Sequence, residues 1–165
     1  MAASPDPFQP LLDDHEEFLE KLNELEAVLD EMMNTREANE ANLELLDESI
    51  RFFEEDVLPH FAREDAIVLP PMEASIGRFG TLVNVVAYEH EEIRREIAKF
   101  KEARSQLDAT RDPWPAIQEL NRHGIFTIQF LWDHFRKEKV SLFPPPAKSL
   151  AADQLAEIGR RLAQA

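Results

Sequence analysis

The chain has 165 residues, enough for a single domain with a substantial hydrophobic core. It carries 33 acidic and 18 basic residues, a formal net charge of −15, so its surface repels phosphate backbones and disfavours nucleic-acid binding. The absence of cysteine excludes disulfide scaffolds, thiolate metal sites and cysteine nucleophiles. The start, "MAASPDPFQP", does not resemble a signal peptide, and no apolar run reaches membrane-spanning length, so we expect a soluble cytoplasmic protein without membrane contacts.

Glu, Leu, Ala and the basic residues favour helices, and no stretch resembles a strand, so we expect an all-α fold. The first predicted helix covers residues 10–33. Asn34 and Glu37 have the spacing of a capping box that would start a second helix. We expect that helix to end before the double proline at 70–71, because proline lacks the amide donor and restrains the residue before it.

The second half of the chain predicts two more long helices and a short one. A linker containing Gly77 and Gly80 precedes the third helix, over roughly 81–107. The Asp-Pro pair at 112–113 predicts the N-cap and first position of a fourth helix, which should end before Pro144. Four long helices with short connections predict an up-down-up-down bundle.

The C-terminal residues predict a short additional helix capped by Ser149. Its apolar face would comprise Ala151, Leu155, Ile158 and Leu162. We expect residues 1–146 to form the bundle and residues 147–165 to pack on it, with a lid or a partner surface as the alternative role of this helix.

Polar residues interrupt the apolar stripes of the long helices. On the second helix, a stripe spaced alternately by four and three residues runs through Leu46, Ile50, Phe53, Val57, His60, Glu64 and Ile67. His15 and His90 occupy similar positions on the first and third helices, and His134 with Glu138 on the fourth. Four histidines and two glutamates are therefore predicted at core positions.

These residues belong to a repeated helical hairpin. "HFAREDAIVLPP" at 60–71 and "HFRKEKVSLFPP" at 134–145 share His, Phe, Glu and both prolines, and "DHEEF" at 14–18 resembles "EHEEI" at 89–93. Each copy has a histidine on its first helix and His-x-x-x-Glu on its second. Approximate two-fold packing of the copies would bring six side chains to one level: His15, His60, Glu64, His90, His134 and Glu138.

A buried set of two carboxylates and four imidazoles requires cations, because an unpaired buried carboxylate is strongly destabilising. Two metal ions would compensate: imidazoles can serve as terminal ligands, and each carboxylate has two oxygens with which to bridge. Two bridging carboxylates and two histidines give each ion four protein donors. An oxo or hydroxo bridge would make five and leave a coordination position open. Such mixed ligands suit iron, zinc and manganese alike.

Together the four motifs resemble the hemerythrin-like, or HHE cation-binding, domains over nearly the whole chain. The resemblance implies a left-handed four-helix bundle around a non-haem di-iron centre. Members of that family bind dioxygen, and some act in oxygen, nitric oxide or iron sensing, in peroxide breakdown, or in iron handling. The implied ligands are His15 and His60 for one iron, His90 and His134 for the other, and Glu64 and Glu138 as bridges.

Two departures from the oxygen-carrying hemerythrins favour ligand sensing or reactivity over simple oxygen transport. Arg94 stands where those proteins have the second histidine of a His-x-x-x-His pair. Glu138 follows its histidine by four residues rather than five. Three further acidic residues near the motifs are displaced from the histidine faces and are expected to be solvated: Glu16, Glu91 and Glu92.

The sequence supports one leading function and leaves two alternatives open. The leading one is a di-iron protein that binds dioxygen, nitric oxide or peroxide at an open coordination position, in sensing, detoxification or iron and oxygen handling. The alternatives are a catalase-like or other di-iron oxidoreductase and a metal-stabilised regulatory interaction module. A ferritin-like site would require Glu three residues before His, which none of the five histidines has. His123 lies about 16 Å along the helix from His134 and is not expected to be a ligand.

Overall fold

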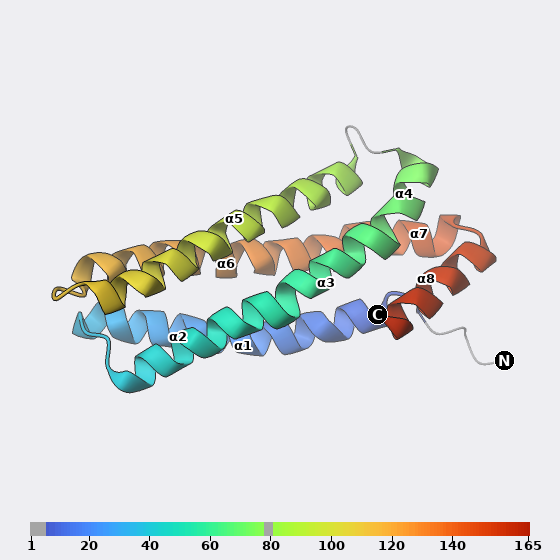
Figure 1. Ribbon diagram of the computed structural model, residues 1–165. Coiled ribbons are helices and arrows are strands. Elements are labelled where there is room, and N and C mark those ends of the chain that lie inside the picture. Colours follow the sequence, from blue (N-terminus) through green and yellow to red (C-terminus); the bar gives the residue numbers. More distant parts are fainter. Residues whose placement is uncertain (1–5, 78–80) are drawn as a thin grey trace.

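The computed structural model describes residues 6–77 and 81–165, and these residues form helices and short connections without a strand. The predicted linker position Gly80 and residues 1–5 lie outside the described residues. The α-helices are α1 Gln9–Thr35, α2 Glu40–Phe52, α3 Leu58–Arg63, α4 Leu69–Ile76, α5 Leu82–Ala109, α6 Trp114–Lys137, α7 Pro144–Ser149 and α8 Ala152–Gln164, and the π-helical turns are η1 Phe53–Val57, η2 Glu64–Val68 and η3 Glu138–Leu142. The long helices pack side by side as a bundle (Figure 1), which confirms the all-α expectation. No helix in the described ranges has the length and apolar character required to cross a membrane.

The predicted helix stop before Pro70 is wrong, because the π-helical turn η2 leads directly into α4 and carries the helix through both prolines. The predicted stop before Pro144 is confirmed: η3 ends at Leu142, and a bend at Phe143 separates it from α7. Each turn closes with an amide that donates to the carbonyl five residues earlier: Leu58 to Phe53, Leu69 to Glu64 and Phe143 to Glu138. A proline directly follows each of these donors. Within an α-helix, proline lacks a donor and clashes with the carbonyl four residues earlier. The wider π-turn leaves space for the proline ring. It also interrupts the α-helical hydrogen-bond pattern at this point, so the amide that proline lacks is not needed there.

The predicted helix starts are displaced by a few residues. The capping box of α2 is made by Asn39 and Asn42, whose side-chain oxygens accept from each other's backbone amides at 2.8 and 3.1 Å. The predicted cap, Asn34, lies within α1 instead. Helix α6 begins at Trp114, one residue later than expected, and its amide donates to Oδ1 of Asp112 at 3.1 Å.

The C-terminal helix α8 also begins later than predicted. Ser149 belongs to α7, where its hydroxyl donates to the carbonyl of Pro145 at 2.9 Å, and Ala151 is the N-cap of α8. Ile158 and Leu162 are buried against the bundle, whereas Ala151 is exposed. The apolar face of α8 therefore begins one turn later than the sequence pattern suggested.

Two apolar clusters fill the bundle and leave a polar layer between them. The main cluster is built around Phe18, Leu22, Phe53, Phe100 and Leu131. The smaller end cluster contains Phe8, Leu11, Ile67, Val68, Leu69, Met72, Val83, Val86, Leu142, Phe143, Leu150, Ile158 and Leu162. On α1, His15 falls between Leu11 of the end cluster and Phe18 of the main cluster. The same change from one cluster to the other occurs at His90 on α5.

Helix α6 approaches α1 and α5 closely at Gly124. A Cβ atom there would lie 2.6 Å from Cδ1 of Leu29 and 3.1 Å from Cε2 of Phe100. Only a residue without a side chain fits this contact without displacing its neighbours. The close approach helps to hold together three of the four helices whose histidines line the polar layer.

Candidate metal centre

Six polar side chains meet in the layer between the main and end clusters. His15 is 5% exposed, and the other five are fully buried. They are His15 on α1, His60 on α3, Glu64 in η2, His90 on α5, His134 on α6 and Glu138 in η3. Both glutamates are the first residue of a π-helical turn, so each lies where the helix begins to widen. The structure thus brings together the same six residues that the sequence patterns singled out.

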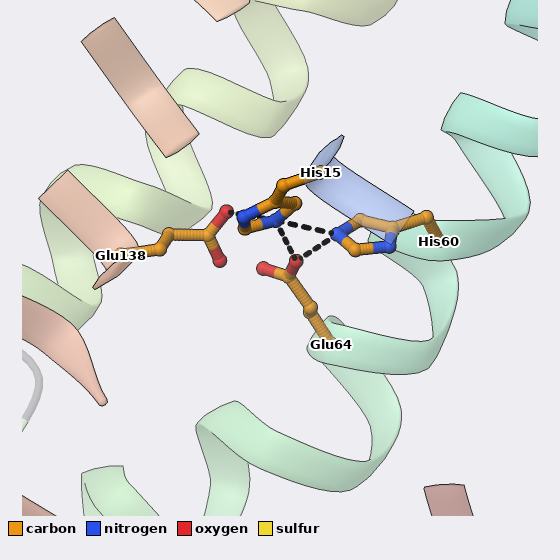
Figure 2. A group of neighbouring side chains, drawn as sticks. All are labelled: His15, His60, Glu64 and Glu138. Atoms are coloured by element: carbon orange, nitrogen blue, oxygen red, sulfur yellow. Dashed lines mark hydrogen bonds and ion pairs between the residues drawn. The ribbon is translucent and has the colours of Figure 1, made fainter. Parts of the chain in front are cut away.

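These side chains form two overlapping groups that share both glutamates. The first ligand group is His15, His60, Glu64 and Glu138 (Figure 2), and the second ligand group is Glu64, His90, His134 and Glu138. Within each group, one donor atom from every residue lies within 4.8 Å of the others. Metal–ligand bonds of about 2.0–2.2 Å place two donors of one ion at most ~4.4 Å apart, so each group can close around an ion with a small adjustment.

Both glutamates lie between histidines of different groups. Oε1 of Glu64 is 2.5 Å from Nε2 of His60, and its Oε2 is 3.3 Å from Nε2 of His90. Glu138 approaches His134 at 3.0 Å and His15 at 3.4 Å, in both cases through Oε1. A carboxylate placed between nitrogen donors of two groups is in the position of a bridging ligand.

Several atoms of this layer have no hydrogen-bond partner among the described residues. They are both carboxylate oxygens of Glu64 and of Glu138, and Nε2 of His90 and of His134. Oxygens of both glutamates lie 2.5–3.4 Å from imidazole nitrogens, but none of these contacts has the geometry of a hydrogen bond. Native proteins seldom leave buried carboxylate oxygens without hydrogen bonds, because this is costly. The unpaired atoms are the ones that face the interior of the two groups, so the donor set fits metal ions.

The histidines differ in how strongly the protein favours their charged forms. Burial lowers the pKa of His60, but the charge of Glu64 and a hydrogen bond to Asp14 outweigh it and raise this pKa to about 9. His90 behaves alike: burial opposes protonation, and Asp65 with Glu64 raises its pKa to about 9. Burial and the neighbouring His60 lower the pKa of His15 to about 3.

The two glutamates divide the negative charge unequally. Burial raises the pKa of Glu138, and the adjacent charge of Glu64 raises it further. Burial also opposes ionisation of Glu64, but the charge of His60 outweighs it and lowers the pKa of Glu64. Without metal, protons therefore compensate the site, and metal ions must displace them because imidazole binds metal in its neutral form.

Outer carboxylates hold three of the four histidines. Oδ2 of Asp14 lies 2.9 Å from Nδ1 of His60 and also accepts from Arg63 at 2.6 Å. Such a hydrogen bond fixes the tautomer of the ring, directs its Nε2 lone pair inward and increases ligand basicity. His60 is therefore oriented as a ligand by its own neighbours.

The other two pairs follow the same plan. Nδ1 of His90 lies 2.7 Å from Oδ1 of Asp65, whose Oδ2 accepts from Arg94 at 2.7 Å. Nδ1 of His134 lies 3.4 Å from Oε1 of Glu89, whose Oε2 accepts from Lys137 at 2.8 Å.

Sequence reasoning missed the carboxylates Asp14, Asp65 and Glu89. A signal existed for two of them, since an acidic residue precedes the histidine in both "DHEEF" and "EHEEI".

In each hairpin, a phenylalanine ring covers the candidate ligand histidine of the first helix. His15 stacks on Phe135 with ring centroids 4.2 Å apart and planes 19° apart. His90 stacks on Phe61 at 4.2 Å and 16°. Each phenylalanine directly follows a candidate ligand histidine of the opposite hairpin. The rings restrict the imidazole orientation and keep water from the layer.

The remaining polar residues considered from the sequence take other roles. Arg94 forms ion pairs with Asp65 and Glu91 and belongs to neither ligand group. Glu16 is exposed, and Glu92 pairs with Arg95. His123 lies between Glu96, at 2.7 Å, and Glu119, at 3.1 Å, and is in neither ligand group.

Comparison with known proteins identifies the domain. The sequence model described as Hemerythrin HHE cation binding domain matches residues 6–145, which include all six candidate ligands. A search of curated proteins found no significant match. The match covers far more than half of the chain and agrees with the buried histidine–glutamate layer. The chain belongs to the hemerythrin HHE cation-binding domain family.

Proposed function

We propose that this protein is a non-haem di-iron protein that binds dioxygen, nitric oxide or peroxide, with a role in sensing, detoxification or iron and oxygen handling. The observation that carries this proposal is the pair of buried ligand groups sharing two carboxylates whose four oxygens have no hydrogen-bond partner within the described residues. His15 and His60 would hold one ion, His90 and His134 the other, and Glu64 and Glu138 would bridge them.

The donor count supports a small exogenous ligand. Each group offers two imidazoles and two carboxylates, fewer donors than the six that iron commonly takes. Two bound irons would supply a redox-active centre with room for a small ligand. The protein's own part is to orient the imidazoles through the outer carboxylates. The phenylalanine stacks and the two apolar clusters restrict the access of water and larger molecules.

The finer architecture and the setting are also proposals. We propose that the helices connect up-down-up-down with a left-handed twist, supported by the short connections and by the packing of α6 against both α1 and α5. We further propose a cytoplasmic location. We also propose that the protein has no nucleic-acid partner, because a net charge of −15 repels phosphate backbones.

Metal analysis combined with optical spectra tests the function. We expect about two irons per chain and near-ultraviolet absorption of a ferric centre that changes on addition of azide, nitric oxide or peroxide. The double variant His60→Ala/Glu64→Ala should lose both the metal and the spectrum. Glu16→Ala, which changes an exposed carboxylate next to His15, should keep them. Less than one transition metal per chain after both aerobic and anaerobic purification would contradict the proposal.

A further inference from the structure

The outer carboxylates repeat between the two hairpins, but incompletely. Asp14 with Arg63 holds His60, and at the equivalent positions of the second hairpin Glu89 with Lys137 holds His134. Both carboxylates directly precede a candidate ligand histidine, and both cations directly precede a candidate bridging glutamate. This part of the site follows the internal symmetry.

The pair that holds His90 breaks the symmetry. Asp65 follows Glu64, and its counterpart after Glu138 is Lys139, an exposed cation. Arg94 lies four residues after His90, and its counterpart four residues after His15 is Leu19. Neither member of the Asp65–Arg94 pair is therefore reproduced in the other half of the site.

His15 consequently lacks the outer carboxylate that anchors each of the other three candidate ligand histidines through Nδ1. No carboxylate in the described part of the chain contacts its Nδ1, and its contacts with Glu64, Glu138 and His60 are all made by Nε2. Stacking on Phe135 restricts the plane of the ring but leaves the tautomer unfixed. The first ligand group has one anchored histidine, whereas both histidines of the second are anchored.

We propose that the two metal positions are unequal: the second ligand group fills first and holds its ion more tightly, and Asp65 with Arg94 is the positioning pair that sets this order. The inference rests on the proposed di-metal site. An outer partner of a ligating histidine changes metal affinity by about 10–100-fold, so the missing anchor at His15 predicts a gap of about tenfold between the two microscopic affinities. The first ligand group is then the exchangeable half of the centre.

Calorimetric titration of the metal-free protein with ferrous iron under argon tests the order. Wild type should show two binding events about tenfold apart in affinity. Asp65→Asn should weaken the tighter event and narrow the gap, and Arg94→Leu, which copies Leu19, should do so to a smaller extent. Asp47→Asn breaks a remote pair with Arg104 (2.9 Å) and should leave both events unchanged.

A gain of affinity provides a test that loss of folding cannot mimic. Lys139→Asp changes an exposed residue and gives His15 the carboxylate that Asp65 gives His90, so it should strengthen the weaker event and bring the two affinities together. Equal affinities in wild type, or an unchanged gap in both Asp65→Asn and Lys139→Asp, would overturn the proposed order while leaving the di-metal site intact. Absence of any iron binding by folded wild type would overturn the proposed function itself.

Discussion

The ring of Phe135 lies nearly parallel to the imidazole of His15, with centroids 4.2 Å apart, and is the main restraint on the orientation of that imidazole. The equivalent ring, Phe61, covers His90, which Asp65 also holds. The two stacks therefore have similar geometry, but the stack on His15 contributes more to the orientation of its imidazole than the stack on His90 does.

Phe135→Leu should accelerate metal loss more than Phe61→Leu. Both substitutions remove a buried ring at comparable cost in packing, but only His15 then lacks both an aromatic and a carboxylate restraint. The rate of iron transfer to an external chelator, followed by absorbance, measures the difference. Equal acceleration by the two variants would show that the stack on His15 has no special role.

Replacing each bridging candidate with glutamine should separate metal binding from folding. Burial and the charge of Glu64 raise the pKa of Glu138, which favours its protonated form in the metal-free pair. Glu138→Gln should therefore change the unfolding free energy of the metal-free protein by less than about 1 kcal/mol. The same substitution should abolish the binding of the more weakly held of the two ions.

Glu64→Gln should instead leave the charged imidazole of His60 without its partner 2.5 Å away, at a cost of about 3–5 kcal/mol. Urea unfolding and metal analysis of both variants test the contrast. Equal destabilisation by the two substitutions would contradict the unequal division of charge.

The stability of the metal-free protein should fall on both sides of about pH 6.5. The pKa values of His60 and His90 are raised from 6.5 to about 9, so their contribution is complete below pH 6.5 and is lost as the pH rises toward 9. The pKa of His15 is lowered from 6.5 to about 3 in the folded protein. Between these pH values His15 is protonated in the unfolded chain but neutral in the folded chain, so stability falls as the pH drops below 6.5.

Metal affinity should show the opposite trend above neutrality, because iron competes with the protons on His60 and His90. Urea unfolding with chelator present, together with iron titrations between pH 6.5 and 9, measures both quantities. A metal affinity independent of pH over this range would disagree with the charged states assigned to these histidines.

The contact at Gly124 predicts a packing effect remote from the ligands. Gly124→Val should destabilise the fold by about 1–3 kcal/mol, because its side chain would overlap Leu29 and Phe100. In α8, a Cβ at Gly159 would approach only Pro7, at 3.4 Å, so Gly159→Ala should be neutral or stabilise by up to about 1 kcal/mol. Thermal unfolding of both variants checks the prediction, and a tolerated valine at 124 would show that α6 can move outward.

The histidine and glutamate positions were predictable because burial and repetition leave a direct trace in sequence. A polar residue on an apolar stripe is visible in one helix, and its recurrence in a second hairpin makes coincidence implausible. His60 with Glu64 and His134 with Glu138 were identifiable on these grounds alone.

The helix ends and the outer carboxylates were less accessible. Proline at 70 reads locally as a stop, and only the three-dimensional path shows that a π-turn carries the helix past it. Asp65 looks like a solvated neighbour of Glu64 until α5 brings His90 to within 2.7 Å. Pairings between helices depend on rotation and spacing that a single stripe does not specify.

The composition of the ligand groups has a consequence for how such a centre can be assembled. Each hairpin supplies two imidazoles and one carboxylate to its own position, and it lacks only one carboxylate, which the other hairpin supplies. Two identical hairpins related by a dyad would provide the same inventory of donors. The centre thus has the donor stoichiometry of a homodimer within a single polypeptide, and its two halves can therefore differ in sequence.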